Sequence, residues 1–392
     1  MNAKTGKVQF GNFDYGLNEE DEQRASNLHR ESIVCDMLYW GPCSYLSTSP
    51  EMTKELEIFW QTYHDPGKTT LLGIFQHQRL ALQGKFPHFK ECWEESGLTA
   101  GNRMVDGFTS LEALLYCFGW NQALFDHFPW LIKALKAEDI RRAKAEGKHA
   151  SWINTQLAYG VNLDFIKLVE PAYMMGLRII QLSYNYMTYI ASGCTERTDA
   201  GVSTYGAKLI QLMNVLGIIV DISHCGRQTT LDACKLSTKP VIASHASAEG
   251  VYKHARAKSD EELKAIAETG GVIGIVTVPF FLAGEESVNM ESWLDHADYI
   301  AELVGWEHVA IGSDWPMPMP KSILKQAFAS FATEAGFRKE DNIDTTVNLV
   351  GFDDYRDLPN ITRGLVSRGY SDVQIKGILG ENFCRVFEEV CG

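Results

Sequence analysis

Short apolar segments alternate with amphipathic segments along the second half of the chain, and this alternation constrains the fold more than any other feature. The apolar segments are nearly continuous in apolar character, which is typical of parallel strands covered on both faces. They are residues 149–154, 176–184, 217–223, 239–244, 271–277 and 308–313. The segments between them have helical spacing, at 163–175, 205–216, 228–236, 260–268 and 292–304. Strand, helix, strand in this order predicts a parallel sheet, either doubly wound or closed into a barrel.

An eight-stranded barrel needs two further strands, which the first third of the chain must supply. Residues 32–38 (SIVCDML) form an apolar run of strand length, and residues 104–117 (MVDGFTSLEALLYC) are the candidate for the other strand. The stretch 47–100 is rich in aromatic residues and has no strand–helix pattern, so we expect a helical insertion or cap near the active face. We therefore predict an α/β fold: one (α/β)8 barrel of TIM type over residues 31–392, preceded by an N-terminal extension over residues 1–30.

Charge and cysteine content exclude several classes of protein. The 392 residues include 50 acidic and 36 basic side chains, for a formal net charge of −14, which argues against a general binder of nucleic acid or anionic membrane. Nine cysteines are scattered without a CxxC pair, as is typical of reduced thiols. The first thirty residues hold no apolar signal segment, and no run approaches the ~20 apolar residues of a spanning helix. We expect a cytoplasmic protein that acts on a small molecule.

Polar residues follow three of the predicted strands at the point where each strand ends. These residues are His224, His245 and Asp314. Because the carboxyl ends of barrel strands form the catalytic face, all three side chains should lie in one mouth. Two imidazoles and a carboxylate suit one divalent metal ion, with the carboxylate as a ligand or as a proton acceptor for bound water. The pattern predicts catalytic roles for all three residues.

Aromatic residues gather at or just after the same predicted strand ends, which indicates an enclosed, apolar pocket. They are Tyr39, Trp40, Trp152, Tyr184, Tyr186, Tyr189, Phe280, Phe281 and Trp315. Arg256 adds a planar guanidinium that suits a carboxylate or phosphate. The combination favours a substrate with an apolar or aromatic body and one acidic group.

The segment DISHCGRQTTLDACKLSTKPVIASHASAEGVYKHARAKSDEELKAIAETGGVIGI resembles the corresponding stretch of the membrane dipeptidases, peptidase family M19. DIRRAKAEGKHASWINTQ, MGLRIIQLSYNY, WLDHADYIAELVGWEHVAIGSDW and GILGENFCRVF have counterparts in the same order. The resemblance runs from about residue 33 to the C-terminus and is weakest between residues 41 and 130. It implies a barrel of the metal-dependent hydrolase (amidohydrolase-like) superfamily, two bridged zinc ions, cleavage of dipeptides or similar amides, and a homodimer.

The chain departs from the family pattern at several metal ligands. The first strand of the family ends in D-G-H-x-D, whereas this chain has Asp36-Met37-Leu38-Tyr39-Trp40. The stretch that should hold the bridging glutamate is residues 153–156 (INTQ), which offers amides, and Tyr184 replaces a substrate-facing histidine. The resemblance retains His224 and His245 as metal ligands, Arg256 for a substrate carboxylate, and Asp314 as the acid/base partner of a metal-bound water.

A binuclear metal site is not expected from these residues. Two histidines and one carboxylate cannot offset two divalent ions held close together, because uncompensated like charges in a buried mouth are costly. We expect one divalent ion, with zinc as the first choice, on His224 and His245. Further candidate ligands are Asp314, Asn154 and Asp36. A metal-free site in which the two histidines act as acid/base groups is the alternative.

Three functions remain open at this stage. The first is a dipeptidase-like hydrolase that uses a metal-activated water. The second is a metal-dependent lyase, decarboxylase or C–C hydrolase on the same barrel, and the third is a binding relative without catalysis. The residues expected to contact substrate are Arg256, Tyr184, Trp40, Trp152, Asn154, Phe280 and Trp315.

Overall fold

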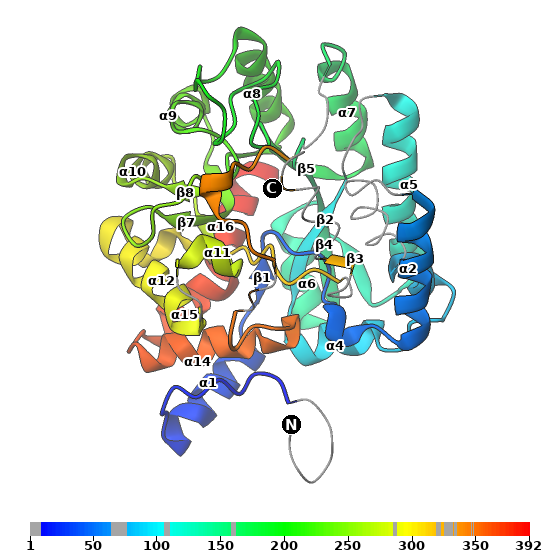
Figure 1. Cartoon of the computed structure of the whole chain (residues 1–392), viewed down its shortest axis with the longest axis vertical. Helices are drawn as coiled ribbons and strands as arrows, with labels where there is room; N and C mark the ends of the chain where they lie inside the picture. Colours follow the sequence, from blue (N-terminus) through cyan, green and yellow to red (C-terminus); the bar gives the residue numbers. More distant parts are fainter. Residues whose placement is uncertain are drawn as a thin grey trace.

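The computed structural model describes residues 9–63, 77–105, 110–157, 162–284, 288–318, 323–324, 332, 335–345, 347 and 349–392. Parallel strands at its centre are surrounded by helices (Figure 1). In order around the sheet these strands are β1 (Cys35–Asp36), β2 (Ala100–Met104), β4 (His149–Thr155), β5 (Leu177–Gln181), β6 (Ile219–Asp221), β7 (Val241–Ala248), β9 (Ile273–Ile275) and β10 (Val309–Ile311). The N–H of Met37 donates to the carbonyl of Ile311 at 2.9 Å, which joins the two ends of the sheet. The predicted (α/β)8 barrel is confirmed.

Two short strands lie off this path. β3 (Leu131–Lys133) pairs with β4, and β8 (Ala257–Lys258) pairs with β7. The helices that connect the barrel strands are α5 (Leu111–His127), α6 (Ala137–Ala145), α7 (Ile166–Met175), α8 (Thr204–Leu216), α9 (Arg227–Leu236), α10 (Asp260–Glu268), α11 (Pro279–Leu282) and α12 (Met290–Val304). Side-chain caps begin several of them, such as Ser203 before α8 and the capping box of Ser259 and Glu262 on α10. All five predicted helices are confirmed.

Seven of the eight predicted strands overlap the observed ones, but the strand predicted at 104–117 is wrong. Its place in the barrel is taken by β2, which it overlaps only at Met104. Residues 111–117 lie in α5, and residues 106–109 lie outside the described residues. Ser110 caps α5 by accepting a hydrogen bond from the N–H of Ala113. The buried side chains of α5 are Leu114, Cys117, Phe118, Asn121 and Leu124, a helical spacing.

The C-terminal helix α16 (Asn382–Cys391) packs against the interior of the barrel at the amino-terminal end of its strands. The indole of Trp152 lies against the rings of Phe383 and Phe387, with centroids 4.7 and 5.9 Å away. Trp152 is fully buried in this cluster. This packing corrects the prediction that Trp152 contacts substrate, because the residue belongs to the core of the barrel.

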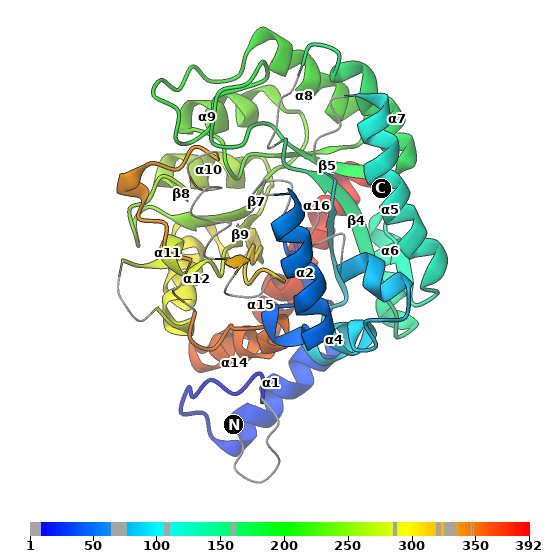
Figure 2. The same cartoon turned by 45° about the vertical axis from the view of Figure 1, so that its right-hand side comes forward.

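The described part of the stretch 47–100 is largely helical. It contains α2 (Pro50–Tyr63), a helical turn at residues 77–82 and α4 (Phe89–Ser96), and a short 3-10 helix, η1 (Tyr45–Ser47), leads into it. Helix α1 (Glu19–Glu31) lies beside α14 (Pro359–Ser367) at the bottom of Figures 1 and 2, and α15 (Asp372–Lys376) follows. None of the described helices is long and apolar enough to cross a membrane.

Candidate active site

The structure brings His224, His245 and Asp314 to the same end of the barrel. His224 follows β6 and Asp314 follows β10, and both line one cavity. The rings of His224 and His245 have centroids 4.9 Å apart. His245 was expected just after its strand, but β7 continues to Ala248, and the pairing with β9 shifts register between Ala243 and Ala246. Such an irregularity changes the direction of a side chain, which accounts for the placement of His245.

The hydrogen bonds around His224 define which ring nitrogen holds the proton. Nδ1 of His224 lies 2.8 Å from Oδ1 of Asn185. The orientation of the Asn185 amide follows from its Nδ2, which donates to the carbonyl of Ala335 at 2.7 Å. Because an amide oxygen can only accept, Nδ1 of His224 carries the hydrogen and Nε2 carries the lone pair.

A second network defines the tautomer of His245. Nδ1 of His245 lies 2.8 Å from the hydroxyl of Ser244, and that hydroxyl donates its own hydrogen to the buried Asp221 carboxylate at 2.5 Å. Ser223 donates to the same carboxylate at 2.6 Å. Nδ1 of His245 must therefore donate to Ser244, which leaves the lone pair on Nε2. This Nε2 is buried and has no hydrogen-bond partner among the described residues.

Both imidazoles are held in the neutral form. Burial, followed by the positive charge of Arg256, lowers the pKa of His224 and of His245 well below the usual value. Neutral imidazoles that donate through one nitrogen and keep a lone pair on the other are in the form that binds a metal ion. Within the described ranges, no group of three or more His, Cys, Asp or Glu side chains is arranged to hold a metal. The two imidazoles are candidate ligands for a metal ion, and by themselves they make an incomplete ligand set.

Asp314 has the electrostatic setting of a proton-transfer group. Burial raises its pKa to about 7, assisted by the negative charge of Asp36 and opposed by Arg256. Its backbone has a φ of 55°, its N–H donates to the carbonyl of Leu38 at 2.8 Å, and its carbonyl accepts from the indole of Trp40 at 2.8 Å. A carboxyl with a pKa near 7 can both accept and return a proton at neutral pH.

The cavity beside these groups is small and mainly aromatic. Its lining residues are Trp40, Tyr184, His224, Val278, Phe280, Phe281, Asp314, Trp315, Met317 and Phe337. Tyr184 stacks on His224 with ring centroids 3.8 Å apart. The volume of about 30 Å³ is enough for only one or two water molecules. A substrate must therefore displace some of these side chains.

Arg256 does not have the position expected of it. Its guanidinium is buried, and its Nη1 and Nη2 donate to the carbonyls of Ser223 and His245, at 3.1 Å for His245. It is not among the residues that line the cavity. Two of its nitrogens fix the backbone at the ends of two neighbouring strands, and its contact with a substrate carboxylate stays a prediction.

Two further candidate ligands are already bound within the protein. Both carboxylate oxygens of Asp36 accept hydrogen bonds, one from the Ser313 hydroxyl and the other from the backbone N–H groups of Ser313 and Leu38. Oδ1 of Asn154 accepts from Nδ2 of Asn102 at 2.9 Å. Neither residue lines the cavity. The structure thus uses Asp36 to tie β1 to β10, and Asn154 to tie β4 to β2.

Several functional residues were missed from the sequence. Asn185, Asp221 and Ser244 orient the two histidines, and Met317 and Phe337 complete the wall of the cavity. Asp221 ends β6 and Ser223 follows two positions later, which is the spacing of residues on one face of a strand, so this pattern could have suggested the network. Asn185 gives no such signal. It lies in a loop, and no pattern in the sequence indicates its positive φ of 57°.

Replacing Asn185 tests whether it positions His224. In Asn185→Gly we expect a lower kcat, because glycine adopts a φ of 57° without strain but cannot accept from Nδ1. We also expect a lower free energy of unfolding, by about 1–3 kcal/mol for each buried group left unpaired, such as the Ala335 carbonyl. Asn185→Asp keeps the acceptor and should retain more activity than the glycine variant. Steady-state kinetics and thermal unfolding of the two variants are the measurements. Equal loss of activity in both variants would contradict the positioning role.

The buried carboxyl of Asp36 predicts a pH-dependent stability. Burial raises its pKa to about 7, so the folded protein binds a proton that the unfolded chain releases near pH 4. The stability of the folded state should therefore fall as pH rises from about 4 to about 7, by up to about 1.4 kcal/mol per pH unit for this group. Urea unfolding of the metal-free protein across this range should show a weaker dependence in Asp36→Asn. The exposed Asp126→Asn is the control and should match the unmodified protein.

Comparison with known proteins agrees with the barrel fold. A sequence profile of the membrane dipeptidase family (peptidase family M19) matches residues 118–326 and 341–391, more than half of the chain. The chain belongs to the membrane dipeptidase family. That family consists of metal-dependent hydrolases, and this chain is an enzyme of that general kind.

Solved structures support the same assignment of the fold. An amidohydrolase from Pseudomonas aeruginosa has a TM-score of 0.72 and 26% identity, over 93% of this chain and 98% of its own. The probable dipeptidase PvdM from Pseudomonas aeruginosa has a TM-score of 0.67 and 19% identity, over 95% and 99%. A metallopeptidase from Rhodobacter sphaeroides, solved with a phosphinate mimic of the dipeptide L-Ala-D-Ala, has a TM-score of 0.63 and 18% identity, over 82% and 96%.

Proposed function

We propose that this member of the membrane dipeptidase family is a dipeptidase-like hydrolase with a reduced metal site. His224 and His245 hold one divalent ion, with zinc as the first choice, and Asp314 transfers protons beside it. The observation that carries the proposal is the pair of buried, neutral imidazoles, each oriented through Nδ1 so that Nε2 keeps its lone pair. The buried Nε2 of His245 has no hydrogen-bond partner among the described residues, whereas a histidine with a purely structural role would have one.

The chain's own residues have distinct roles in this proposal. A bound metal ion supplies a Lewis acid that lowers the pKa of a water molecule. Asn185 and Ser244 hold the two imidazole rings in place, and the Asp314 carboxylate takes a proton from the attacking water and returns it to the leaving group. The aromatic wall excludes bulk water from the reacting groups, which strengthens each electrostatic interaction inside.

The proposed substrate is a small amide or similar acyl compound with an apolar or aromatic body. Of the cavity's lining residues, only His224 and Asp314 carry strongly polar side chains apart from the Tyr184 hydroxyl and the Trp nitrogens. Arg256, the residue predicted to bind the acidic group of the substrate, donates to two backbone carbonyls in the structure. The dipeptide mimic bound by the Rhodobacter sphaeroides metallopeptidase makes small dipeptides the first compounds to test.

Metal analysis combined with a substrate panel tests this function. Protein saturated with zinc and freed of excess ion should lose its metal in His224→Ala and in His245→Ala. The control His127→Ala, an exposed residue at the end of α5, should retain it. Dipeptides and N-acyl amino acids with aromatic side chains should be hydrolysed only by metal-loaded protein. Metal binding without turnover of any panel member would contradict the hydrolase and favour lyase or decarboxylase chemistry.

Location and assembly are also part of the proposal. All nine cysteines are free thiols, which supports a reducing, cytoplasmic setting. A homodimer is the assembly that the family resemblance implies.

A further inference from the structure

Two glutamine side chains at the carboxyl ends of neighbouring strands have buried amide atoms without partners. Gln181 ends β5 and Gln156 directly follows β4, and they are 0% and 3% exposed. Nε2 of Gln181 donates to the carbonyls of Gln156 and Ser183, at 3.0 and 2.9 Å, so its Oε1 is the remaining acceptor. That Oε1 and the Nε2 of Gln156 have no hydrogen-bond partner among the described residues. Because buried polar atoms are nearly always bonded, the two amides indicate a place for a ligand.

Alternation along the strands directs both side chains into the barrel. Ile179 packs in the interior cluster with Trp152, whereas Ile180 packs in the cluster outside the sheet. Gln181 therefore faces the interior again. Gln156 lies four residues after Trp152, so the same alternation directs it inward.

This level of the interior lies directly below the catalytic cavity. Gln181 is in register with Asp221 on β6, the carboxylate at the base of the network that orients His245. Three residues further along the two segments, Tyr184 and His224 line the cavity. A substrate that displaces the aromatic side chains of the cavity therefore reaches the two amides.

The carboxylates in this part of the barrel are already in use. Both oxygens of Asp221 accept from serine hydroxyls, and both oxygens of Asp36 accept from Ser313. Among the residues that line the cavity, Asp314 is the only acid, and the proposed reaction uses it for proton transfer. Gln181 thus offers a neutral acceptor where a carboxylate would be needed to pair with an ammonium group.

Buried positive charge at the same end of the barrel opposes a cationic ligand. The guanidinium of Arg256 is buried and donates to two backbone carbonyls, and the buried ammonium of Lys258 lies 3.3 Å from Glu262. Burial, and after it the charges of Arg256 and Lys258, lower the pKa of His245 well below its usual value. The field that opposes a proton on His245 also opposes an ammonium group beside it.

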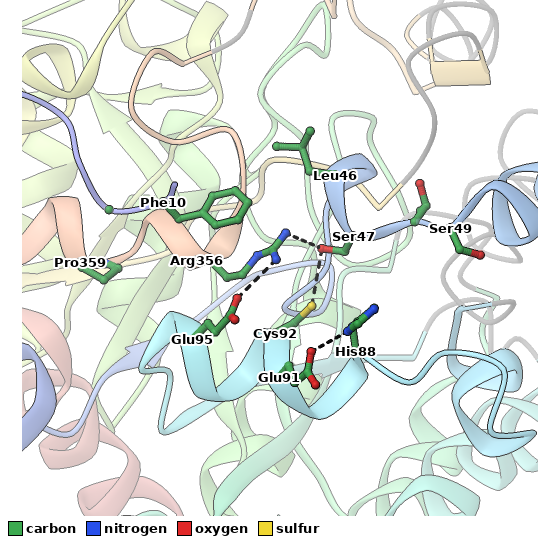
Figure 3. A pocket seen from close by; sticks show the side chains of 12 residues that line it. Phe10, Leu46, Ser47, Ser49, His88, Glu91, Cys92, Glu95, Arg356 and Pro359 are labelled. Atoms are coloured by element: carbon green, nitrogen blue, oxygen red, sulfur yellow. Dashed lines mark hydrogen bonds and ion pairs between the residues drawn. The ribbon is translucent and has the colours of Figure 1, made fainter. Parts of the chain in front are cut away.

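The charged side chains of a larger pocket elsewhere on the chain are paired with one another. This pocket has a volume of about 720 Å³ and lies between the N-terminal segment at Phe10, η1 and α4 (Figure 3). Nδ1 of His88 lies 2.5 Å from Glu91, and Arg356 donates to Glu95 at 3.4 Å (Figure 3). A ligand there would have to compete with these pairs, whereas the two glutamine amides offer atoms without a partner.

We propose that Gln156 and Gln181 bind an uncharged secondary amide of the substrate, so that the enzyme prefers N-acylated compounds to compounds with a free ammonium group. Oε1 of Gln181 accepts from the N–H of that amide, and Nε2 of Gln156 donates to its acyl oxygen. The inference rests on the proposed hydrolase function of the same site and names the class of amide that the site accepts. A free dipeptide would bury its ammonium group against a neutral acceptor, which is costly.

Two phenylalanine derivatives that differ in charge test the inference. N-acetyl-phenylalanine amide is uncharged, whereas phenylalanine amide carries an ammonium group when the pH is below the pKa of its amine. Zinc-loaded protein is titrated with each compound, and tryptophan fluorescence reports binding, because Trp40 and Trp315 line the cavity. We expect the acetylated compound to bind at least about tenfold more tightly, because an unpaired buried charge is costly. Equal affinities, tighter binding of phenylalanine amide, or binding of neither compound would overturn the inference.

The variant Gln156→Met removes the donor and keeps the approximate size of the side chain. We expect the acetylated compound to bind about threefold to tenfold more weakly, and phenylalanine amide to bind as before. The melting temperature should not fall, because the buried Nε2 has no partner to lose. The matched control is Ser32→Ala, which removes an unpartnered buried hydroxyl at the end of α1 and should leave both affinities unchanged. Unchanged affinities in Gln156→Met would overturn the inference.

Release of ammonia or acetate from the same two compounds measures the hydrolase function separately. Tighter binding of the acetylated compound without release would support the amide site and count against hydrolysis. Release from both compounds at equal kcat/KM would support the hydrolase and overturn the preference for N-acylated compounds.

Discussion

Asp314→Asn should lower kcat by about a hundredfold to ten-thousandfold, the range that loss of a general acid–base group produces. The amide cannot take a proton from water, yet it keeps the size of the side chain and the backbone bond to Leu38. Metal content should remain at the level of the unmodified protein, because His224 and His245 are intact. Stopped assays with the best substrate of the panel, together with metal analysis, are the measurements.

The pH dependence of kcat/KM gives this variant a second readout. The pKa of Asp314 in the metal-free site is about 7, so activity should rise with pH as the carboxyl ionises and level off above that value. A bound metal ion lowers the pH at the midpoint of this rise, because a cation favours the ionised carboxylate. Asp314→Asn should lose this rise. An unchanged profile in the variant would show that another group transfers the proton.

Arg256→Ala should reduce the free energy of unfolding by about 2–6 kcal/mol, because it leaves two buried carbonyls unpaired at about 1–3 kcal/mol each. These are the carbonyls of Ser223 and His245, and the same change leaves space in the core. Loss of the guanidinium should also raise the pKa of His224 and His245, since its charge contributes to lowering them. Urea unfolding measures the first effect, and NMR titration of the imidazoles measures the second.

An exposed arginine provides the matched control for this experiment. Arg227 pairs with Glu249 at 2.8 Å on the surface, so Arg227→Ala should change stability by less than about 1 kcal/mol. If Arg256 bound a substrate carboxylate, Arg256→Ala would change KM and leave the free energy of unfolding unchanged. A raised KM with unchanged stability in Arg256→Ala would restore the substrate-binding role.

The barrel could be predicted because most of its strands are continuous apolar runs. β2 has the sequence AGNRM and could not be found in this way. Its polar residues are buried because the tertiary structure satisfies them: Asn102 bonds to Asn154 and to the N–H of Tyr39, and Arg103 bonds to Asn121. No periodicity in the sequence indicates such partners, which come from three other segments of the chain.

The candidate site was only partly predictable for a related reason. His224, His245 and Asp314 directly follow apolar runs, and strand ends share one face of a barrel. The role of Arg256 depends on which acceptors lie within reach of its guanidinium, and that of Trp152 depends on the position of α16. Both roles depend on packing between distant segments of the chain. Residue type alone suggested a contact with substrate, whereas in the structure each side chain contacts other residues of the protein.

The most direct test of the account is the number of metal ions bound per chain. Purified protein is stripped with a chelator, saturated with zinc, freed of excess ion and measured by elemental analysis against protein concentration. We predict one zinc ion per chain in the unmodified protein and none in the His224→Ala, His245→Ala double variant. Two ions per chain, or one ion retained by the double variant, would contradict the single metal site on these histidines.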